Sequence, residues 1–165
     1  MRYATLLILI LSTASGCDMP GQTTTPAAQG SLAQNKKIVR GYIEEIINGD
    51  HWDAWDKYFQ TEIGFNGKRV GRLDMQRRVA SFKAAYPDMK LTIEEQIAEG
   101  DRVVTRVTCR GTHLGIDEGV APSGRRVSYA GIAIDRIKDG KVIEMRYLGD
   151  NWERIRQIRE EPPAP

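Results

Sequence analysis

The feature that most constrains the fold is a change of hydrophobic period near Pro87. Before it, apolar residues recur every three or four positions, which is typical of one face of a helix. These helical segments are 31–48, 51–60 and 72–86. After it, alternating and β-branched residues predict strands. The strand segments are 91–97, 102–112, 125–137 and 141–149. Three helices followed by four strands, without βαβ alternation, predict an α+β fold.

Local signals around the last strands support this assignment. Lys138-Asp139-Gly140 predicts a hairpin turn, because Asp-Gly favours the positive φ angles of tight turns. Asp150 and Glu153 predict a capping box at the start of a closing helix. We therefore expect a cone-shaped, curved antiparallel sheet that wraps over three N-terminal helices, with a short C-terminal helix. The open mouth of such a cone suits a small molecule.

Residues 1–16 are typical of an export signal. Arg2 precedes an apolar run over 4–11, which is shorter than the ~20 apolar residues that span a bilayer, and small or polar residues follow. Ala14-Ser15-Gly16-Cys17 resembles the lipobox of bacterial lipoproteins. This resemblance implies cleavage before Cys17 and attachment of lipid to its thiol. A plain secretory signal that leaves Cys17 free is the alternative.

The remaining chain divides into a tether, one domain and a tail. Residues 17–30 are rich in Pro, Gly and Thr, which predicts a flexible tether, and 160–165 predict a disordered tail. The segment 31–159 is long enough for one core. Asp18 resembles the inner-membrane retention signal of enteric-type lipoproteins. We expect a protein anchored in the cell membrane on its periplasmic side, with the inner membrane favoured.

Charge and metal-ligating residues exclude several functions. The chain has 24 Lys and Arg against 22 Asp and Glu, a balance that does not indicate nucleic-acid binding. We interpret the arginines over 154–159 as solvated charges. The two histidines, His51 and His113, lack a shared short spacing, so we expect no metal, and nothing indicates a cofactor. Cys109 lies in an apolar strand, which predicts a core position.

An ordered set of short motifs runs through the domain. The set is Gly100-Asp101-Arg102-Val103, Arg106, Gly111-Thr112-His113-Leu114-Gly115, Pro122-Ser123-Gly124-Arg125-Arg126-Val127, Asp135-Arg136, Asp139-Gly140-Lys141-Val142, Glu144, Asp150 and Gln157. It resembles the SnoaL-like polyketide cyclase (ester cyclase) family of the nuclear-transport-factor-2-like superfamily, over roughly residues 33–158. The resemblance implies the cone-shaped fold and a pocket for a small, largely apolar ligand. It also implies, by analogy, a homodimer through the uncovered face of the sheet.

The chemistry of the family does not transfer with the fold. In its cyclases an aspartate on the last long strand moves the proton, and a histidine lies on the preceding strand. Alignment from the Asp-Gly-Lys turn places them at Tyr147 and Ala133. Strand alternation directs Met145 and Tyr147 toward the cavity, and leaves Glu144 and Arg146 to pair on the other face. A cyclase, isomerase or hydrolase and a non-catalytic ligand-binding or protein-interaction module both stay open.

The candidate catalytic residues are Tyr147, Asp150 and His113. Asp150 also fits a helix N-cap, and His113 could line the mouth or fix a loop. The candidate ligand-binding residues are Tyr42, Trp55, Arg106, Tyr129, Met145 and Tyr147. Arg106 interrupts an apolar strand, so we expect Asp135 on the next strand to be its partner. The glycine-rich loop 115–124 is interpreted as a flap or as a plain connection.

Overall fold

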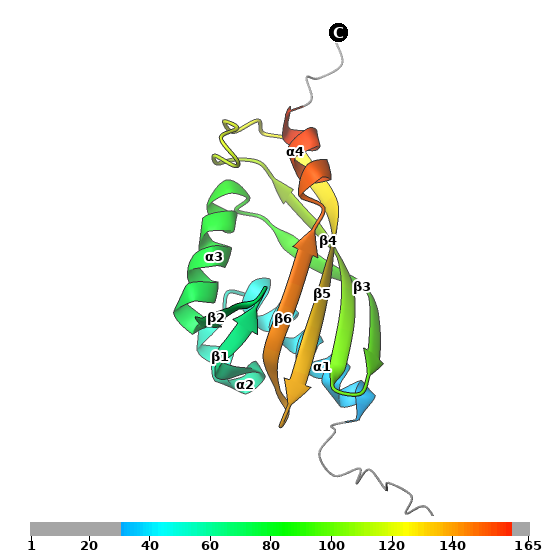
Figure 1. The fold of residues 1–165 in the computed structure, drawn as a ribbon. Helices are drawn as coiled ribbons and strands as arrows, with labels where there is room; N and C mark the ends of the chain where they lie inside the picture. The colour runs from blue at the N-terminus through cyan, green and yellow to red at the C-terminus, as the bar shows by residue number, and fades with distance from the viewer. Residues whose placement is uncertain (1–30, 160–165) are drawn as a thin grey trace, which may run out of the picture.

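The computed structural model describes residues 31–159. The proposed signal 1–16, the tether 17–30 with Cys17, and the tail 160–165 lie outside the described residues. A curved sheet forms one side of the domain, and helices cover its concave face (Figure 1). The predicted α+β class with a curved, unclosed sheet is confirmed. No described helix is long and apolar enough to cross a membrane.

The elements follow one another in an order that mixes helices and strands in the first half. They are α1 (Leu32–Tyr42), η2 (Ile43–Ile47), η3 (Trp52–Ala54), α2 (Trp55–Tyr58), β1 (Phe59–Phe65), β2 (Lys68–Gly71), α3 (Arg72–Ala85), β3 (Lys90–Glu99), β4 (Arg102–Thr112), β5 (Arg126–Lys138), β6 (Lys141–Gly149) and α4 (Asn151–Arg159). The strands lie in the order β2-β1-β6-β5-β4-β3.

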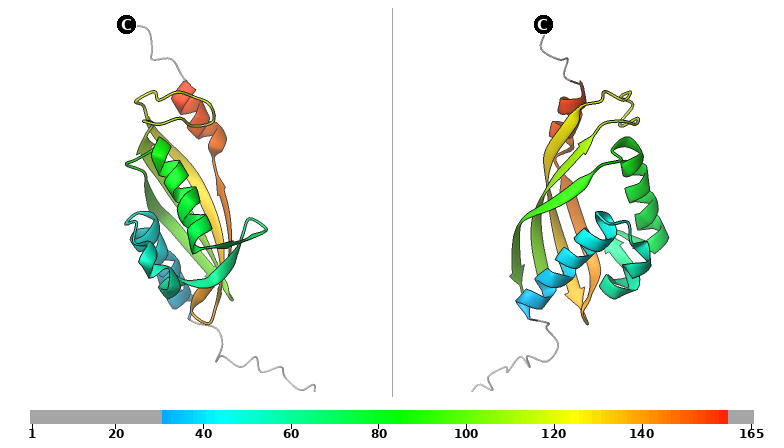
Figure 2. Two further views of the ribbon diagram at one scale, coloured as in Figure 1. Left: turned by 90° about the vertical axis from the view of Figure 1, so that its left-hand side faces the viewer. Right: turned by 180° about the vertical axis from the view of Figure 1, so that it is seen from behind.

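The first predicted helix is present as α1 and the π-helical turn η2. Ser31 caps its start, because the Ser31 hydroxyl oxygen accepts the Gln34 N–H at 3.1 Å. Val39 and Ile46 of its apolar stripe are fully buried, whereas Leu32 at its start is 47% exposed. Both side views show α1 and α3 on the same side of the sheet (Figure 2). These two helices therefore supply the helical wall of the interior.

The second predicted helix is wrong at its end. Residues 52–58 form a 3-10 turn and one turn of α-helix, but Phe59 is already extended, with φ −122° and ψ 154°. The spacing of Trp55 and Phe59 fits a helix, yet Trp55 belongs to α2 and Phe59 to β1. Their rings are stacked, with centroids 4.2 Å apart. Burial of both rings in one cluster satisfies the apolar pattern without a continuous helix.

The hairpin of β1 and β2 is not predicted by the hydrophobic pattern of the sequence. Asn66 and Gly67 form its turn with positive φ angles of 46° and 81°, as the Asn-Gly pair favours. β1 pairs with β6 in parallel, so the sheet has one parallel pair beside its antiparallel ones. The expected four antiparallel strands are therefore β3 to β6, extended by a hairpin that connects the sheet to α3.

The last strands and α4 follow the prediction closely. Asp139 and Gly140 have the positive φ angles of the predicted hairpin turn. Asp150 caps α4, since its carboxylate accepts the Glu153 N–H at 3.0 Å. The other half of the predicted capping box is absent, because the Asp150 N–H donates to the Ala130 carbonyl. Gln157 fixes α4 on β5 through hydrogen bonds with both backbone groups of Ser128.

Candidate functional site

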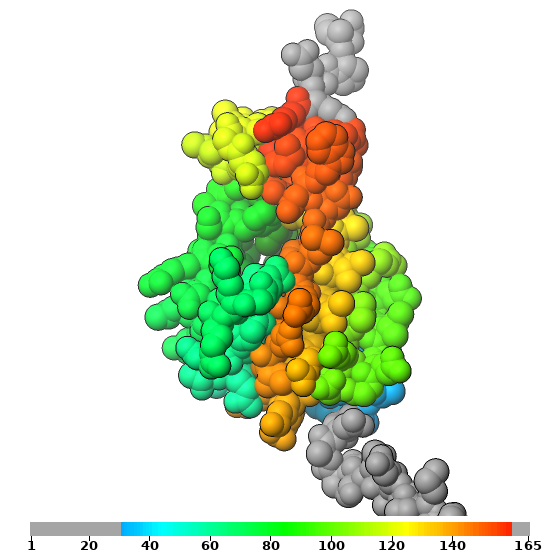
Figure 3. Space-filling view, viewed as in Figure 1, coloured from blue at the N-terminus to red at the C-terminus, as the bar shows by residue number. Residues whose placement is uncertain are grey.

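A cavity of about 360 Å³ lies between the concave face of the sheet and the helices. This volume falls within the range of small-molecule sites. The surface is hollowed between the α3 side of the molecule and β6 (Figure 3). The lining residues are Tyr42, Ile43, Ile47, Phe65, Met75, Arg78, Val79, Phe82, Met89, Leu91, Val107, Cys109, Tyr129, Ala133, Met145, Tyr147, Asn151 and Arg154. Most of these side chains are apolar or aromatic, so the cavity suits an apolar molecule.

Strand alternation explains the sheet side of this wall. On β4 every second residue is buried, and Val107 and Cys109 face inward. On β6, Met145 and Tyr147 line the cavity, whereas Arg146 is exposed and pairs with Glu144 at 3.1 Å. The predicted direction of Tyr147 is therefore confirmed. An alignment shifted by one residue would place Arg146 in the cavity instead.

Tyr147 stands opposite Ala133 across β5 and β6. Both residues line the cavity, so the two positions that the family resemblance singled out do face each other. Neither side chain is a carboxylate or an imidazole. Gly131 leaves room for the phenol, because a Cβ there would lie 2.5 Å from the Tyr147 hydroxyl.

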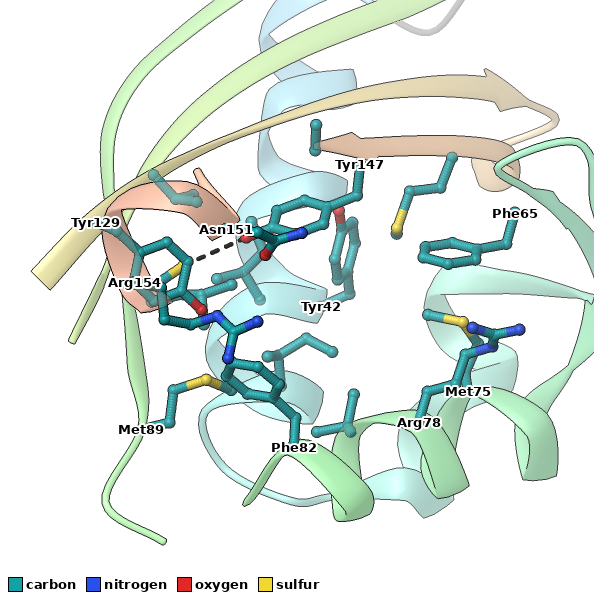
Figure 4. A pocket seen from close by; sticks show the side chains of 18 residues that line it. Tyr42, Phe65, Met75, Arg78, Phe82, Met89, Tyr129, Tyr147, Asn151 and Arg154 are labelled. Carbon is teal, nitrogen blue, oxygen red and sulfur yellow. Dashed lines mark hydrogen bonds between the residues drawn. The ribbon is translucent and has the colours of Figure 1, made fainter. Parts of the chain in front are cut away.

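Two phenols and a thiol meet at one end of the cavity. The Tyr147 hydroxyl lies 3.3 Å from the Cys109 sulfur, and Tyr129 is the cross-strand partner of Cys109 (Figure 4). Burial raises the pKa of all three groups, and the neighbouring thiol raises the pKa of both phenols further. These groups therefore stay protonated at neutral pH and act as hydrogen-bond donors rather than bases.

The buried carboxylate next to the cavity belongs to Asp135. It is fully buried, and the Tyr42 hydroxyl donates to its two oxygens at 3.2 and 3.1 Å. Burial raises the pKa of Asp135 to about 7, which the hydrogen bond from Tyr42 only partly offsets. Tyr42 lines the cavity and separates it from Asp135. A titratable group thus lies one side chain away from the cavity.

Arg106 does not contact Asp135, and this expectation is wrong. Arg106 lies on the outer face of β4, where its side chain is 49% exposed and pairs with Glu95 at 3.5 Å. The alternation of β4 explains the error, since the buried positions are the odd-numbered ones. Trp55 does not line the cavity either. It is buried in the core, and its indole N–H donates to the Gln60 carbonyl at 3.0 Å.

His113 and Asp150 lie outside the cavity lining. His113 is fully buried, and its Nδ1 accepts the Ser123 N–H at 3.2 Å. Burial lowers the pKa of His113, which favours the neutral ring. His113 therefore fixes the loop over 113–125, and Asp150 caps α4. These are the structural alternatives that the sequence offers for the two residues: a loop-fixing histidine and a helix N-cap.

Three polar residues of the site are absent from the candidates that the sequence predicts: Arg78, Asn151 and Arg154. Arg154 was interpreted as a solvated charge, but it is only 3% exposed. Its position four residues before the buried Ile158 places both on one face of α4, a spacing that could have identified it. Within residues 31–159, no group of three or more His, Cys, Asp or Glu side chains could hold a metal ion.

Comparisons with known proteins agree with this geometry. The sequence profile of the SnoaL-like polyketide cyclases matches residues 37–158. Among solved structures, AclR of Streptomyces galilaeus, provisionally described as a hydroxylase, is 27% identical, with a TM-score of 0.68 and coverage of 82% of this chain and 87% of its own. A protein of Jannaschia sp. CCS1, provisionally described as a SnoaL-like polyketide cyclase, is 26% identical, with a TM-score of 0.70 and coverage of 81% and 98%.

A third similar structure shares the fold at lower identity. TsrD of Streptomyces laurentii is 24% identical, with a TM-score of 0.71 and coverage of 79% of this chain and 98% of its own. No curated protein matches the chain significantly.

Proposed function

Because the chain belongs to the SnoaL-like polyketide cyclase family, we propose that its domain binds a small, largely apolar molecule in the cavity under the sheet. The observation that carries this proposal is the cavity itself, with its apolar wall and few polar groups. The hydroxyls of Tyr129 and Tyr147 supply hydrogen bonds that orient the ligand, since burial keeps both protonated. A non-catalytic ligand-binding or protein-interaction module of the cell envelope is the alternative function.

A blocked cavity tests the binding function. The mature chain, produced without its lipid, is incubated with a periplasmic extract, and bound small molecules are identified by mass spectrometry. Val79 lines the cavity from α3, so we expect Val79→Trp to fill it and abolish the bound fraction. Ala80→Trp is the matched control, because Ala80 is the exposed neighbour of Val79 on α3. Equal recovery from both variants would exclude this cavity as the binding site.

Acid–base catalysis is a second candidate function, and Asp135 favours it. A carboxylate with a pKa of about 7 has the proton affinity that a general base needs near neutral pH. Its hydrogen bond with Tyr42 connects it to a residue of the cavity wall. Aldol-type cyclases and isomerases that pass through an enolate share one first step, the removal of a proton next to a carbonyl group. This step is the reaction that the Asp135–Tyr42 pair would support.

Deuterium exchange tests this chemistry without knowledge of the substrate. The apolar ketone 2-tetralone is incubated with the protein in D₂O, and loss of its α-protons is followed by NMR. An acid–base enzyme accelerates the exchange, and Asp135→Asn removes the acceleration. Exchange at the buffer rate in the presence of bound ketone would favour the non-catalytic module.

We propose further that Cys17 anchors the protein in the cell membrane, on the periplasmic side. The support is the order of a positive end, an apolar run and a lipobox-like sequence in residues 1–17. Asp18 favours the inner membrane. Attachment through a lipidated N-terminus and a tether would leave the cavity of the domain accessible to dissolved molecules.

We also propose that the domain forms a homodimer through the outer face of the sheet. Ile132 and Leu148 are cross-strand partners on that face, and they are 46% and 76% exposed. Ile134 adds a third exposed apolar side chain from β5. Contact between two such faces would cover these side chains.

A further inference from the structure

The charged side chains that line the cavity all carry the same sign. Arg78 and Arg154 belong to the lining, and none of its described members is a carboxylate. Asp117 and Asp135 do contact lining residues, but Asp117 pairs with Arg154 and Asp135 accepts from Tyr42. Because Asp117 balances the charge of Arg154, Arg78 is the uncompensated charge of the cavity wall, and Arg154 adds buried N–H donors; this combination favours a ligand that carries a negative charge.

Arg154 is held in a buried and only partly satisfied position. Its guanidinium lies 5.2 Å from the centroid of the Phe82 ring and pairs with Asp117 of the loop over 113–125. Tyr86 also contacts this pair, since its hydroxyl donates to Asp117 at 2.5 Å. The Arg154 Nε is buried and has no hydrogen-bond partner among the described residues. An unpaired buried N–H is unfavourable, and a bound acceptor would remove that penalty.

Arg78 provides the uncompensated positive charge, on the opposite side of the cavity from Arg154 (Figure 4). It is an exposed residue of α3, and its guanidinium lies 5.5 Å from the centroid of the Phe65 ring. Within residues 31–159, no ion pair joins Arg78 to a carboxylate. An exposed charge of this kind attracts an anion from solution, whereas a buried guanidinium fixes it in place.

From these observations we propose that the ligand is an apolar acid, and that the guanidinium of Arg154, which lines the cavity and has an unpaired Nε, binds its carboxylate. The proposal rests on the binding function described above and specifies the chemical class of its ligand. Planar guanidinium and carboxylate groups match each other's hydrogen-bonding geometry. The apolar body of the acid then lies among Met145, Phe82 and Val79, which line the same cavity.

A competition assay with two matched molecules tests this assignment. The mature chain, produced without lipid, is loaded with the neutral fluorescent reporter N-phenyl-1-naphthylamine. Decanoate and decanamide then compete with it at neutral pH, below the concentrations at which they form micelles. The two share chain length and differ in the charge of the head group. We expect decanoate to displace the reporter at a concentration about ten-fold lower than decanamide.

Three variants locate the source of the preference. Arg154→Met combined with Asp117→Asn removes both buried charges together, which avoids a lone buried carboxylate, and we expect it to abolish the preference. Arg154→Lys retains the positive charge and keeps part of the preference. Arg159→Met is the control, because Arg159 is exposed on the same helix. Circular dichroism and binding of the neutral reporter verify that each variant is folded.

The outcomes separate the two proposals. If the reporter binds and both competitors displace it equally, the domain binds apolar molecules in the cavity, but the proposal that its ligand is an acid is wrong. If a preference for decanoate survives in the Arg154→Met/Asp117→Asn double variant, the carboxylate binds elsewhere. If neither the reporter nor the competitors bind to the wild-type protein, the binding function itself fails.

Discussion

At the scale of single residues, the interior combines an apolar wall with a few polar groups that lack full partners. Tyr147 stands where the family resemblance places an acid–base aspartate, and its environment suits a donor, because burial and the nearby Cys109 raise its pKa. The buried carboxylate nearest the cavity is that of Asp135, two positions from Ala133 on β5. The Tyr42 hydroxyl donates to it and lies between it and the cavity. A buried carboxylate therefore lies beside the cavity wall on β5, although neither position 133 nor position 147 supplies one.

Replacement of Tyr147 by Phe tests its role as an orienting donor. A neutral hydrogen bond contributes about 1 kcal/mol, so Tyr147→Phe is expected to weaken binding of a carbonyl-containing ligand several-fold. The fold is expected to remain, since the ring stays in place beside Gly131. Calorimetric titration with 2-tetralone measures the change. Unaltered affinity would mean that the phenol does not contact the ligand.

Asp135 predicts a dependence of stability on pH. Burial raises its pKa from 3.8 to about 7, so between about pH 4 and 7 the folded protein holds a proton that the unfolded chain has released. The free energy of unfolding therefore falls as the pH rises through this window, by about 4 kcal/mol, and levels off above it. Asp135→Asn keeps an acceptor for Tyr42 and is expected to flatten this profile. Urea unfolding at a series of pH values measures both proteins. A parallel decline in the variant would assign the slope to other groups.

At the scale of elements, the loop over 113–125 is fastened more firmly than its glycine-rich sequence indicates. The backbone N–H groups of Leu114 and Gly115 both donate to the Ala85 carbonyl at the end of α3. Asp117 ties the loop to Arg154 of α4. Its interpretation as a freely moving flap is therefore not favoured. The loop joins the two helices at one end of the cavity.

Gly115 is the residue that allows this close approach. A Cβ at position 115 would lie 2.2 Å from the Ala84 carbonyl oxygen, which is backbone and cannot rotate away. Gly115→Ala is expected to lower the free energy of unfolding by about 1–3 kcal/mol and to make the loop sensitive to protease. Ala121→Ser, an exposed change in the same loop, serves as the control. Chemical unfolding and limited proteolysis provide the two measurements. Stability and protease resistance equal to those of the control would show that the contact between the loop and the end of α3 tolerates a side chain at position 115.

The sequence predicted elements well where one face of each element is buried. The alternation of β4 to β6 and the Asp139-Gly140 turn identified the strands and the direction of Tyr147. The β1–β2 hairpin was missed because its strands are short and its apolar residues overlap a helical spacing around Phe59. Asn66-Gly67 was the available signal. Arg106 and Arg154 were misplaced although the period of their elements indicates their faces: Arg106 lies at an outward position of β4, and Arg154 shares the buried face of α4 with Ile158.

At the scale of the whole molecule, the domain has a covered face and an uncovered one. The helices enclose the cavity on one side of the sheet, and the other side presents charged pairs together with Ile132, Ile134 and Leu148. Ligand binding and assembly would thus use opposite faces of the same strands. The proposed anchor adds a third function at the N-terminus, outside the described residues.

The anchor is tested by its attachment residue. Cys17→Ser is expected to prevent lipid attachment and cleavage by the lipoprotein peptidase. The variant would then differ in mass from the wild-type protein and partition less into detergent. Mass spectrometry and phase separation with Triton X-114 measure the two properties. Identical mass and partitioning would rule out lipidation at Cys17.

Assembly is tested on the uncovered face. Light scattering of the unlipidated mature chain is expected to give the mass of a dimer, and Ile132→Lys the mass of a monomer with an unchanged circular dichroism spectrum. Leu73→Lys is the control, because Leu73 is 59% exposed on α3, away from this face. A monomer at high micromolar concentration in the wild-type protein would refute the dimer.

The parallel pairing of β1 with β6 also sets the order in which the domain can be completed. Phe65 and Met145 lie side by side in the sheet but far apart in the chain, so their contact closes a long loop. During synthesis from the N-terminus, the β1–β2 hairpin is made before β6 and has no partner along one edge until β6 is added. A chain that stops before β6 lacks Met145 and Tyr147 and leaves the hairpin edge open to other strands. We therefore expect the cavity to be among the last features to form, and a chain that ends before β6 to aggregate rather than to bind ligand weakly.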